Sequence, residues 1–280
     1  MQQRQDHVAG ASRSVGDIEV TAVYDGPHQV PLGFLLGVEP AEGRRLGGVT
    51  GDVIPLSVNC FVIRTGGKTI LVDTGGGTTM GTLGLLPANL RTAGVMPEDV
   101  EHILLTHLHR DHSNGLIDAA GAAAFPKADV SLHEEEAGFY LDRTFTEADP
   151  ERWRNGAAEA RRNLAPYRGR VHRFCDGEIF PGISATLLPG HTPGHTGFLV
   201  QSRGEQLLIW GDIVHLPRVQ VPRPDIALVF DVDPNRARTT RQRTFDRVAQ
   251  ERLCVAGAHL DHPGFGYIVR DGSGYRYEAA

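Results

Sequence analysis

The stretch LLTHLHRDHSNG, from Leu104 to Gly115, places three histidines and an aspartate within six positions behind an apolar run. These four residues are His107, His109, Asp111 and His112. Gathering imidazoles and carboxylates so densely costs free energy unless a partner compensates their charge and desolvation. The stretch therefore requires a compensating partner for these side chains, and the identity of that partner is the key to the fold and the function.

The composition is typical of an ordinary globular protein and excludes several functional classes. Of 280 residues, 40% are hydrophobic and 22% are charged, which suffices for a full core. A net charge of −6 argues against a nucleic-acid partner, and we interpret the arginines from Arg236 to Arg243 as a solvated helix face. Because the sequence shows no secretory signal and no membrane-length apolar run, we expect a cytoplasmic protein without membrane contact.

Three cysteines, Cys60, Cys175 and Cys254, lie far apart in the sequence, each in an apolar neighbourhood. Their odd number and the absence of a CxxC motif argue against a disulfide framework and a zinc ribbon. We expect all three to be small buried hydrophobic residues.

The order of elements predicts an α/β protein with much hairpin sheet, built from two similar halves. We expect a flexible N-terminal arm over residues 1–16 and a single domain over residues 17–280. Two β-rich runs joined by Gly66 and Gly67 predict a hairpin, and a helix is predicted to start at Asp149-Pro150. A later helix is predicted over residues 233–252, and the Gly- and Pro-rich segment from Pro31 to Pro55 is predicted to be a long loop.

Three more polar residues follow apolar runs: His191 after ATLLPG, Asp212 after LLIWG and His259 after LCVAGA. Strand ends meet at one edge of a sheet, so we expect all seven residues to converge. Imidazoles and carboxylates suit Zn²⁺ or a similar ion. Seven ligands exceed one tetrahedral shell, so the set predicts two metals that share a bridging carboxylate.

The motifs THLHRDH, LVDTG, PGHTPGH, GD and AH, between Asn59 and His259, resemble the metallo-β-lactamase fold superfamily. The resemblance implies an αβ/βα four-layer sandwich with a dinuclear site at the edge of two sheets. It also implies that one metal is held by His107, His109 and His191, the other by Asp111, His112 and His259, with Asp212 as the bridge. By the same resemblance, Asp73 orients a ligand.

The subfamily is narrowed by individual positions. His109 stands where the diiron flavoprotein branch carries Glu, and Asp212 stands where zinc β-lactamases commonly carry Cys. The segments QLLIWGDIVH and VAGAHLDHPGFGYI look most like the methyl parathion hydrolase group, which is similar in layout to quorum-quenching lactonases. Those lactonases commonly carry Tyr where this chain has His215. Asp261 and His262 also depart from the group, which leaves His262 as an alternative ligand to His259.

The resulting hypothesis is a hydrolase with two divalent ions, Zn²⁺ or else Mn, Co or Fe, and a metal-bridging hydroxide as nucleophile. Asp111 and Asp212 would hold the metals and guide the proton, while His215 either contacts the substrate or packs beside the site. We expect His195 to support a ligand. His133 is expected either to face the cleft or to cap a strand end.

The expected substrates are small molecules: lactones, esters or organophosphate triesters. Their apolar pocket is predicted to contain Leu83, Leu86, Phe139 and Trp153. Alternative functions are an N-acyl homoserine lactonase, a glyoxalase II-like thioesterase and a non-catalytic metal-stabilised binding module. The resemblance also allows a homodimer formed through the segment from Pro31 to Pro55.

Overall fold

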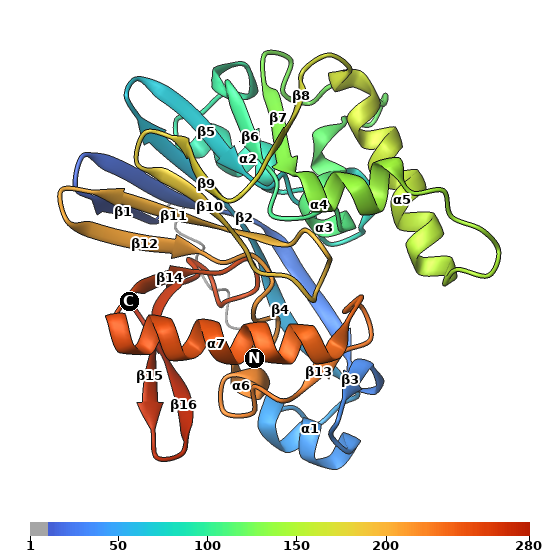
Figure 1. The fold of residues 1–280 in the computed structure, drawn as a ribbon, viewed down its shortest axis with the longest axis vertical. Helices are drawn as coiled ribbons and strands as arrows, with labels where there is room; N and C mark the ends of the chain where they lie inside the picture. Colours follow the sequence, from blue (N-terminus) through green and yellow to red (C-terminus); the bar gives the residue numbers. More distant parts are fainter. Residues whose placement is uncertain (1–10) are drawn as a thin grey trace.

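Two seven-stranded β-sheets pack face to face in the computed structural model, which describes residues 11–280 (Figure 1). The first sheet contains, in spatial order, β1 (Ala11–Val15), β2 (Ile18–Pro31), β4 (Val53–Thr65), β5 (Lys68–Val72), β6 (His102–Leu104), β7 (Asp129–His133) and β8 (Val171–Phe174). The second contains β16 (Gly274–Ala279), β15 (Phe265–Asp271), β14 (Cys254–Ala256), β12 (Glu205–Ile209), β11 (Thr196–Ser202), β10 (Ile183–Leu187) and β9 (Gly177–Phe180).

Apolar side chains from both sheets form the central core, among them Val20, Phe61, Ile70, Phe198 and Leu207. Helices cover the outer faces. Helices α2 (Leu86–Thr92) and α5 (Glu151–Leu164) pack on the first sheet, and α7 (Pro234–Glu251) packs on the second. The order of the layers, helices–sheet–sheet–helix, confirms the predicted αβ/βα four-layer sandwich.

The strand directions bring the functional segments to one edge. Strands β5, β6 and β7 run parallel, so the segments that follow them leave the first sheet on the same side. In the second sheet β14 is parallel to β12, and β10 shares this direction because β11 is antiparallel to both β10 and β12. The segments after β10, β12 and β14 therefore also leave together.

The predicted hairpin and both predicted helices are confirmed. Strands β4 and β5 pair across Gly66 and Gly67, which have φ angles of 55° and 78°. Such left-handed φ angles favour glycine at both positions of a tight hairpin turn. Helix α5 starts directly after Pro150, and the Asp233 side chain caps α7 by accepting from the Arg236 backbone N–H.

The prediction of a long loop from Pro31 to Pro55 is wrong. This segment contains β3 (Leu35–Leu36), which pairs with β13 (Ala227–Leu228), and helix α1 (Pro40–Gly47), which lies near α6 (Pro217–Gln220). These elements gather at one end of the long β2–β4 ribbon (Figure 1). Two glycines hid the helix in the sequence: Gly43 and Gly47 are buried, and a Cβ at either would lie within 3 Å of a neighbouring side chain.

Three further expectations fail in part. The arm prediction is wrong for Ala11–Val15, because this segment pairs with β2 as strand β1, and residues 1–10 lie outside the described part of the chain. Cys175 is exposed, whereas Cys60 and Cys254 are buried as expected. Arg241 is buried rather than solvated, because its guanidinium donates to three backbone carbonyl oxygens, those of Ile213, Pro224 and Ile226.

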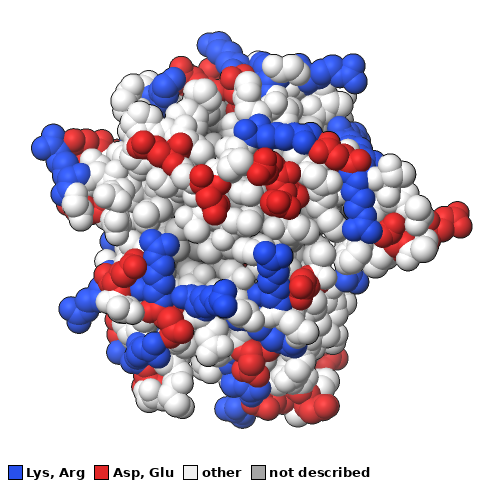
Figure 2. Space-filling view, in the orientation of Figure 1, with Lys and Arg blue, Asp and Glu red and all other residues white. Residues whose placement is uncertain are grey.

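On the face viewed in Figure 2, basic and acidic side chains are interspersed rather than gathered by sign. Among residues 11–280, no helix is both long and apolar enough to cross a membrane.

Candidate metal centre

Both sheets contribute side chains to one cluster at the edge of the sandwich. The segment after β6 carries His107, His109 and the short helix α3 (Arg110–Ser113), and the segments after β10, β12 and β14 carry the rest. The structure thus brings together all seven predicted residues, His107, His109, Asp111, His112, His191, Asp212 and His259.

Asp212 lies at the centre of the cluster. Its Oδ2 is 3.3 Å from the Nε2 atoms of both His191 and His259 and 3.6 Å from His107 Nε2. Its Oδ1 is 3.2 Å from His112 Nε2. Burial alone would raise the pKa of the Asp212 carboxyl, but the surrounding imidazoles outweigh it and hold that pKa well below its usual value.

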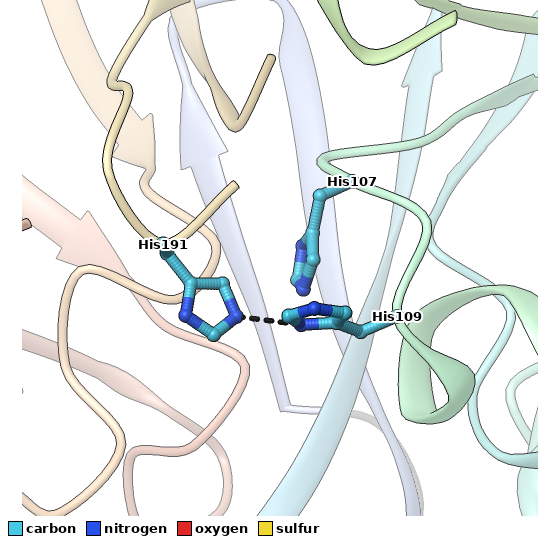
Figure 3. Close-up of side chains that lie close together, drawn as sticks. All are labelled: His107, His109 and His191. Carbon is cyan, nitrogen blue, oxygen red and sulfur yellow. Dashed lines mark hydrogen bonds between the residues drawn. The ribbon is translucent and has the colours of Figure 1, made fainter. Parts of the chain in front are cut away.

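Two groups flank this carboxylate. In Figure 3, His107, His109 and His191 converge on one point, and the dashed line joins His109 Nδ1 to His191 Nε2 at 2.8 Å. In the second group, Asp111 Oδ2 lies 3.4 Å from His259 Nε2 and 3.7 Å from His112 Nε2. The ligand atoms of each group lie within 4.8 Å of one another, close enough to share an ion.

The donor chemistry of this cluster fits metal ions. Four buried atoms, Nε2 of His107, His112 and His259 and Oδ1 of Asp212, have no hydrogen-bond partner within residues 11–280. Leaving a buried polar atom without a partner costs about 1–3 kcal/mol. A metal ion uses these lone pairs as ligands, and His nitrogen with carboxylate oxygen is a common ligand set for zinc.

Hydrogen bonds on the far side of the His112, His191 and His259 rings turn their Nε2 atoms toward the centre. Asp73 Oδ2 lies 2.8 Å from His112 Nδ1, as expected for a residue that orients a ligand. Asp73 has a φ of 59° and also accepts from the backbone N–H and the hydroxyl of Thr106. Aspartate tolerates this left-handed conformation better than most residues, which lets the side chain lie beneath the ligand loop.

His191 and His259 are held in the same way by residues that the sequence did not reveal. His191 Nδ1 is 2.8 Å from Asp231 Oδ1, and His259 Nδ1 is 3.0 Å from the Ser57 carbonyl oxygen. Asn59 fixes the His259 loop by donating its side-chain amide to the carbonyl oxygens of Gly257, Ala258 and Leu260. Because Asp231 precedes the capping residue of α7, it resembles an ordinary helix-start acid in the sequence.

His195 stands beside the cluster and supports Asp212. Its Nε2 accepts the Asp212 backbone N–H at 2.8 Å, and its Nδ1 lies 2.9 Å from the Leu188 carbonyl oxygen. These contacts require the neutral tautomer with the proton on Nδ1. Burial lowers the pKa of His195 to about 3, in agreement with that form.

His215 belongs to the cluster more closely than expected. Its Nε2 lies 3.1 Å from Asp212 Oδ2, its Nδ1 has no partner in the described structure, and its ring stacks on that of His259. Burial lowers the pKa of His215 to about 4. His191, Asp212 and His215 form a further group, whose potential ligand atoms lie within 4.8 Å of one another.

The two other histidines singled out in the sequence, His262 and His133, have other roles. His262 Nδ1 lies 2.9 Å from Asn59 Oδ1, and the groups of potential ligand atoms include His259 but not His262. His133 caps helix α4 (Glu134–Ala137) by accepting the Glu135 backbone N–H, the capping role that the sequence left open.

A cavity of about 600 Å³ opens beside the cluster. Of the four predicted pocket residues only Trp153 lines it. Leu83 and Leu86 are buried in apolar clusters, and Phe139 packs against the first-sheet core and the Trp153 ring. Tyr140, next to the predicted Phe139, also lines the cavity, and the apolar wall further includes Val30, Leu56, Met80 and Phe230, which the sequence did not single out. These residues come from separate segments, so no local pattern could group them.

The comparisons with known proteins agree with this geometry. The sequence pattern of the metallo-beta-lactamase superfamily matches residues 53–264. An N-acyl homoserine lactonase from Bacillus cereus is 26% identical in an alignment 181 residues long, which covers 57% of this chain and 64% of that protein. A second one, from a Bacillus species, is 28% identical in an alignment 172 residues long, which covers 54% of this chain and 61% of that protein. The chain thus spans less than two thirds of these curated relatives.

Among solved structures, the hydrolase AbOPH of the β-lactamase superfamily is 30% identical, with a TM-score of 0.92 over 99% of both chains. AidC, described as a dizinc quorum-quenching lactonase in complex with a product, has a TM-score of 0.90 at 24% identity over 99% of both chains. A probable metal-dependent hydrolase from Staphylococcus aureus has a TM-score of 0.80 at 21% identity, over 96% of this chain and 99% of that one. The last two show the likeness of the fold.

Proposed function

The chain belongs to the metallo-β-lactamase superfamily, and from this premise we propose that it is a dinuclear metal-dependent hydrolase of lactones and carboxylic esters. One observation supports the proposal above all. The cluster, in which four buried ligand atoms lack a hydrogen-bond partner in the described structure, opens onto a cavity of about 600 Å³. A hydrolase needs both features together, whereas a purely structural metal site needs a closed ligand shell.

The ions would be held as the resemblance implied. The triad His107, His109 and His191 would hold one ion, Asp111, His112 and His259 the other, and Asp212 would lie between them. Zn²⁺ suits these ligands, and Mn, Co and Fe also accept them. When bound, such ions polarise a substrate oxygen and lower the pKa of water toward neutrality.

The chain's own groups would position the reaction. Asp73 and Asp231 hold the His112 and His191 rings so that Nε2 faces the centre. His215 is neutral near pH 7, because burial lowers its pKa to about 4. With Nε2–H donated to Asp212, its Nδ1 is left to accept a hydrogen bond from the substrate or from water.

The cavity supports an uncharged substrate with an apolar acyl or aryl group. Leu56, Phe230 and Trp153 line it beside the cluster, and an aliphatic chain or aromatic ring would be desolvated there. The likeness to N-acyl homoserine lactonases makes an N-acyl homoserine lactone the first substrate to test. Aryl phosphotriesters are the second class, favoured by His215 in the GDIVH segment.

The proposal is tested by metal analysis together with a parallel rate assay on the wild type and on His215→Tyr. The substrates are an N-acyl homoserine lactone, a simple δ-lactone, an aryl ester, an aryl phosphotriester and an acyl thioester. We expect about two ions per chain, chelator-sensitive turnover of the lactones and the aryl ester, and a changed lactone-to-phosphotriester ratio in the variant. A folded, metal-loaded protein that turns over none of the five would reject the hydrolase in favour of a metal-stabilised binding module.

A further inference from the structure

We propose that Glu136 is a positioning residue that holds the two loops of the His107, His109 and His191 triad in register. Its Oε1 accepts the Leu108 backbone N–H at 2.8 Å, between two members of the triad. Its Oε2 accepts the Thr192 hydroxyl at 2.6 Å and the Gly194 backbone N–H at 3.0 Å, directly after the third. One carboxylate thus joins both loops. The expectation that this link helps the protein to retain a metal ion rests on the proposed function, whereas the loop contacts themselves do not depend on it.

The contacts of Glu136 with Leu108, Thr192 and Gly194, here called the clamp, connect the two sheets. Glu136 lies on α4, directly after β7 of the first sheet, and the Thr192–Gly194 loop connects β10 and β11 of the second. The contact is close at the backbone as well, because a Cβ at Gly194 would lie 2.0 Å from the Glu136 backbone nitrogen. Because the triad draws ligands from both sheets, a direct link between its loops controls the spacing of its imidazoles.

The chemistry at this position requires an acceptor without donors. A carboxylate offers two oxygens that only accept, and all three surrounding groups are donors. Glu136 is fully buried, and no Lys or Arg within residues 11–280 forms an ion pair with it. An apolar side chain of the same size would leave three buried donors unpaired, each at about 1–3 kcal/mol. Burial raises the pKa of Glu136 to about 7, and the three hydrogen bonds oppose that rise because they stabilise the carboxylate.

Two substitutions test the clamp. In Glu136→Gln the side chain keeps its size, but its amide NH₂ must face either the Leu108 N–H or the Gly194 N–H. Thr192→Val removes only the hydroxyl, and Thr192→Ser restores it as the conservative rescue. Tyr167→Phe is the matched control, because it removes a buried hydroxyl that contacts Leu116 and Phe125 in the first-sheet core and touches neither loop.

The purified, metal-loaded proteins are titrated with a competing chelator, and cobalt-substituted samples are compared by absorption spectroscopy. We expect Glu136→Gln to weaken the retention of one of two ions by about 10- to 100-fold and to change the cobalt spectrum. Thr192→Val should do the same to a smaller extent, and Thr192→Ser and Tyr167→Phe should leave both ions as in the wild type. Wild-type retention and spectrum in Glu136→Gln would overturn the inference.

Hydrogen exchange separates this inference from the proposed function. If the wild type binds no ion at all, the proposed function fails, yet the clamp still predicts that Glu136→Gln speeds amide exchange at Leu108 and Gly194. The Ile70 amide, in the central core, serves as the internal reference. Unchanged exchange at both loop amides would overturn the clamp by itself.

Discussion

Replacing Asp231 with asparagine changes one atom beside His191 and tests how that imidazole is held. Asp231 Oδ1 lies 2.8 Å from His191 Nδ1, and Oδ2 accepts the Leu228 backbone N–H at 2.9 Å. Asparagine offers only one oxygen. If that oxygen faces His191, the NH₂ meets the Leu228 N–H, and if it faces Leu228, the NH₂ forces the His191 proton onto Nε2, where a metal would bind.

Either orientation carries a cost of known size. An unpaired Leu228 N–H costs about 1–3 kcal/mol of folding free energy. Loss of the carboxylate behind a ligating histidine typically costs 10- to 100-fold in metal affinity, which is about 1.4–2.8 kcal/mol. We therefore expect Asp231→Asn to lose at least tenfold in metal affinity, to unfold at lower denaturant concentration, or to show both effects.

Chelator competition and equilibrium denaturation of the metal-free protein measure the two effects. Asp225→Asn is the matched control, because Asp225 is a carboxylate of the same segment in an exposed pair with Arg223 at 2.6 Å. Exposed pairs contribute about 0–1 kcal/mol, so this variant should behave nearly as the wild type. The reasoning is refuted if Asp231→Asn matches the wild type in both metal affinity and stability.

Three other predictions concern pH, the buried arginine and the cavity. His195 resists protonation down to a pKa of about 3, whereas an unfolded histidine titrates near 6.5. The contribution of neutral His195 to the free energy of unfolding is therefore fully present above pH 6.5 and is lost as the pH falls, by about 3 kcal/mol at pH 4. Denaturation of the metal-free protein at several pH values should show this slope and a shallower one in His195→Gln; equal slopes would contradict it. Arg241→Met leaves the carbonyl oxygens of Ile213 and Pro224 unpaired, while that of Ile226 keeps the Gln220 amide, and should cost about 2–4 kcal/mol by denaturation. Arg243→Met, on an exposed position of the same helix, should change stability by less than about 0.5 kcal/mol. An Arg241→Met variant as stable as the wild type would show that these contacts contribute little. Trp153→Ala removes an apolar wall and should raise KM for long-acyl or aryl substrates several-fold with a smaller effect on kcat, while Phe139→Leu, behind that wall, should change KM little. Equal effects of the two substitutions in steady-state assays would place the substrate elsewhere.

Two wrong predictions, the Pro31–Pro55 loop and the solvated Arg241, have the same physical cause. The Pro31–Pro55 segment lacks a clear apolar period because Gly43 and Gly47 fill helix α1 where large side chains would not fit. Arg241 belongs to an arginine run that looks solvated, but helical periodicity turns it inward with Phe245 and Val248. In both cases the packing partner is distant in the sequence, so composition alone indicated the wrong environment.

The sequence by itself determined the seven clustered residues and the layered fold. Each of these residues follows an apolar run or lies in the dense Leu104–Gly115 stretch, and strand direction then forces them to one edge. This information is local and periodic, which is why it can be read without coordinates.

Only the tertiary structure decided that Asp231 and Glu136 support the ligand residues alongside Asp73 and His195, and where a substrate can bind. Asp231 looks like a helix-start acid and Glu136 like one of three exposed glutamates, until folding places them against His191 and the two ligand loops. The cavity wall joins Leu56, Trp153 and Phe230 from three separate segments. Such contacts depend on packing between elements far apart in the chain, and no sequence period encodes them.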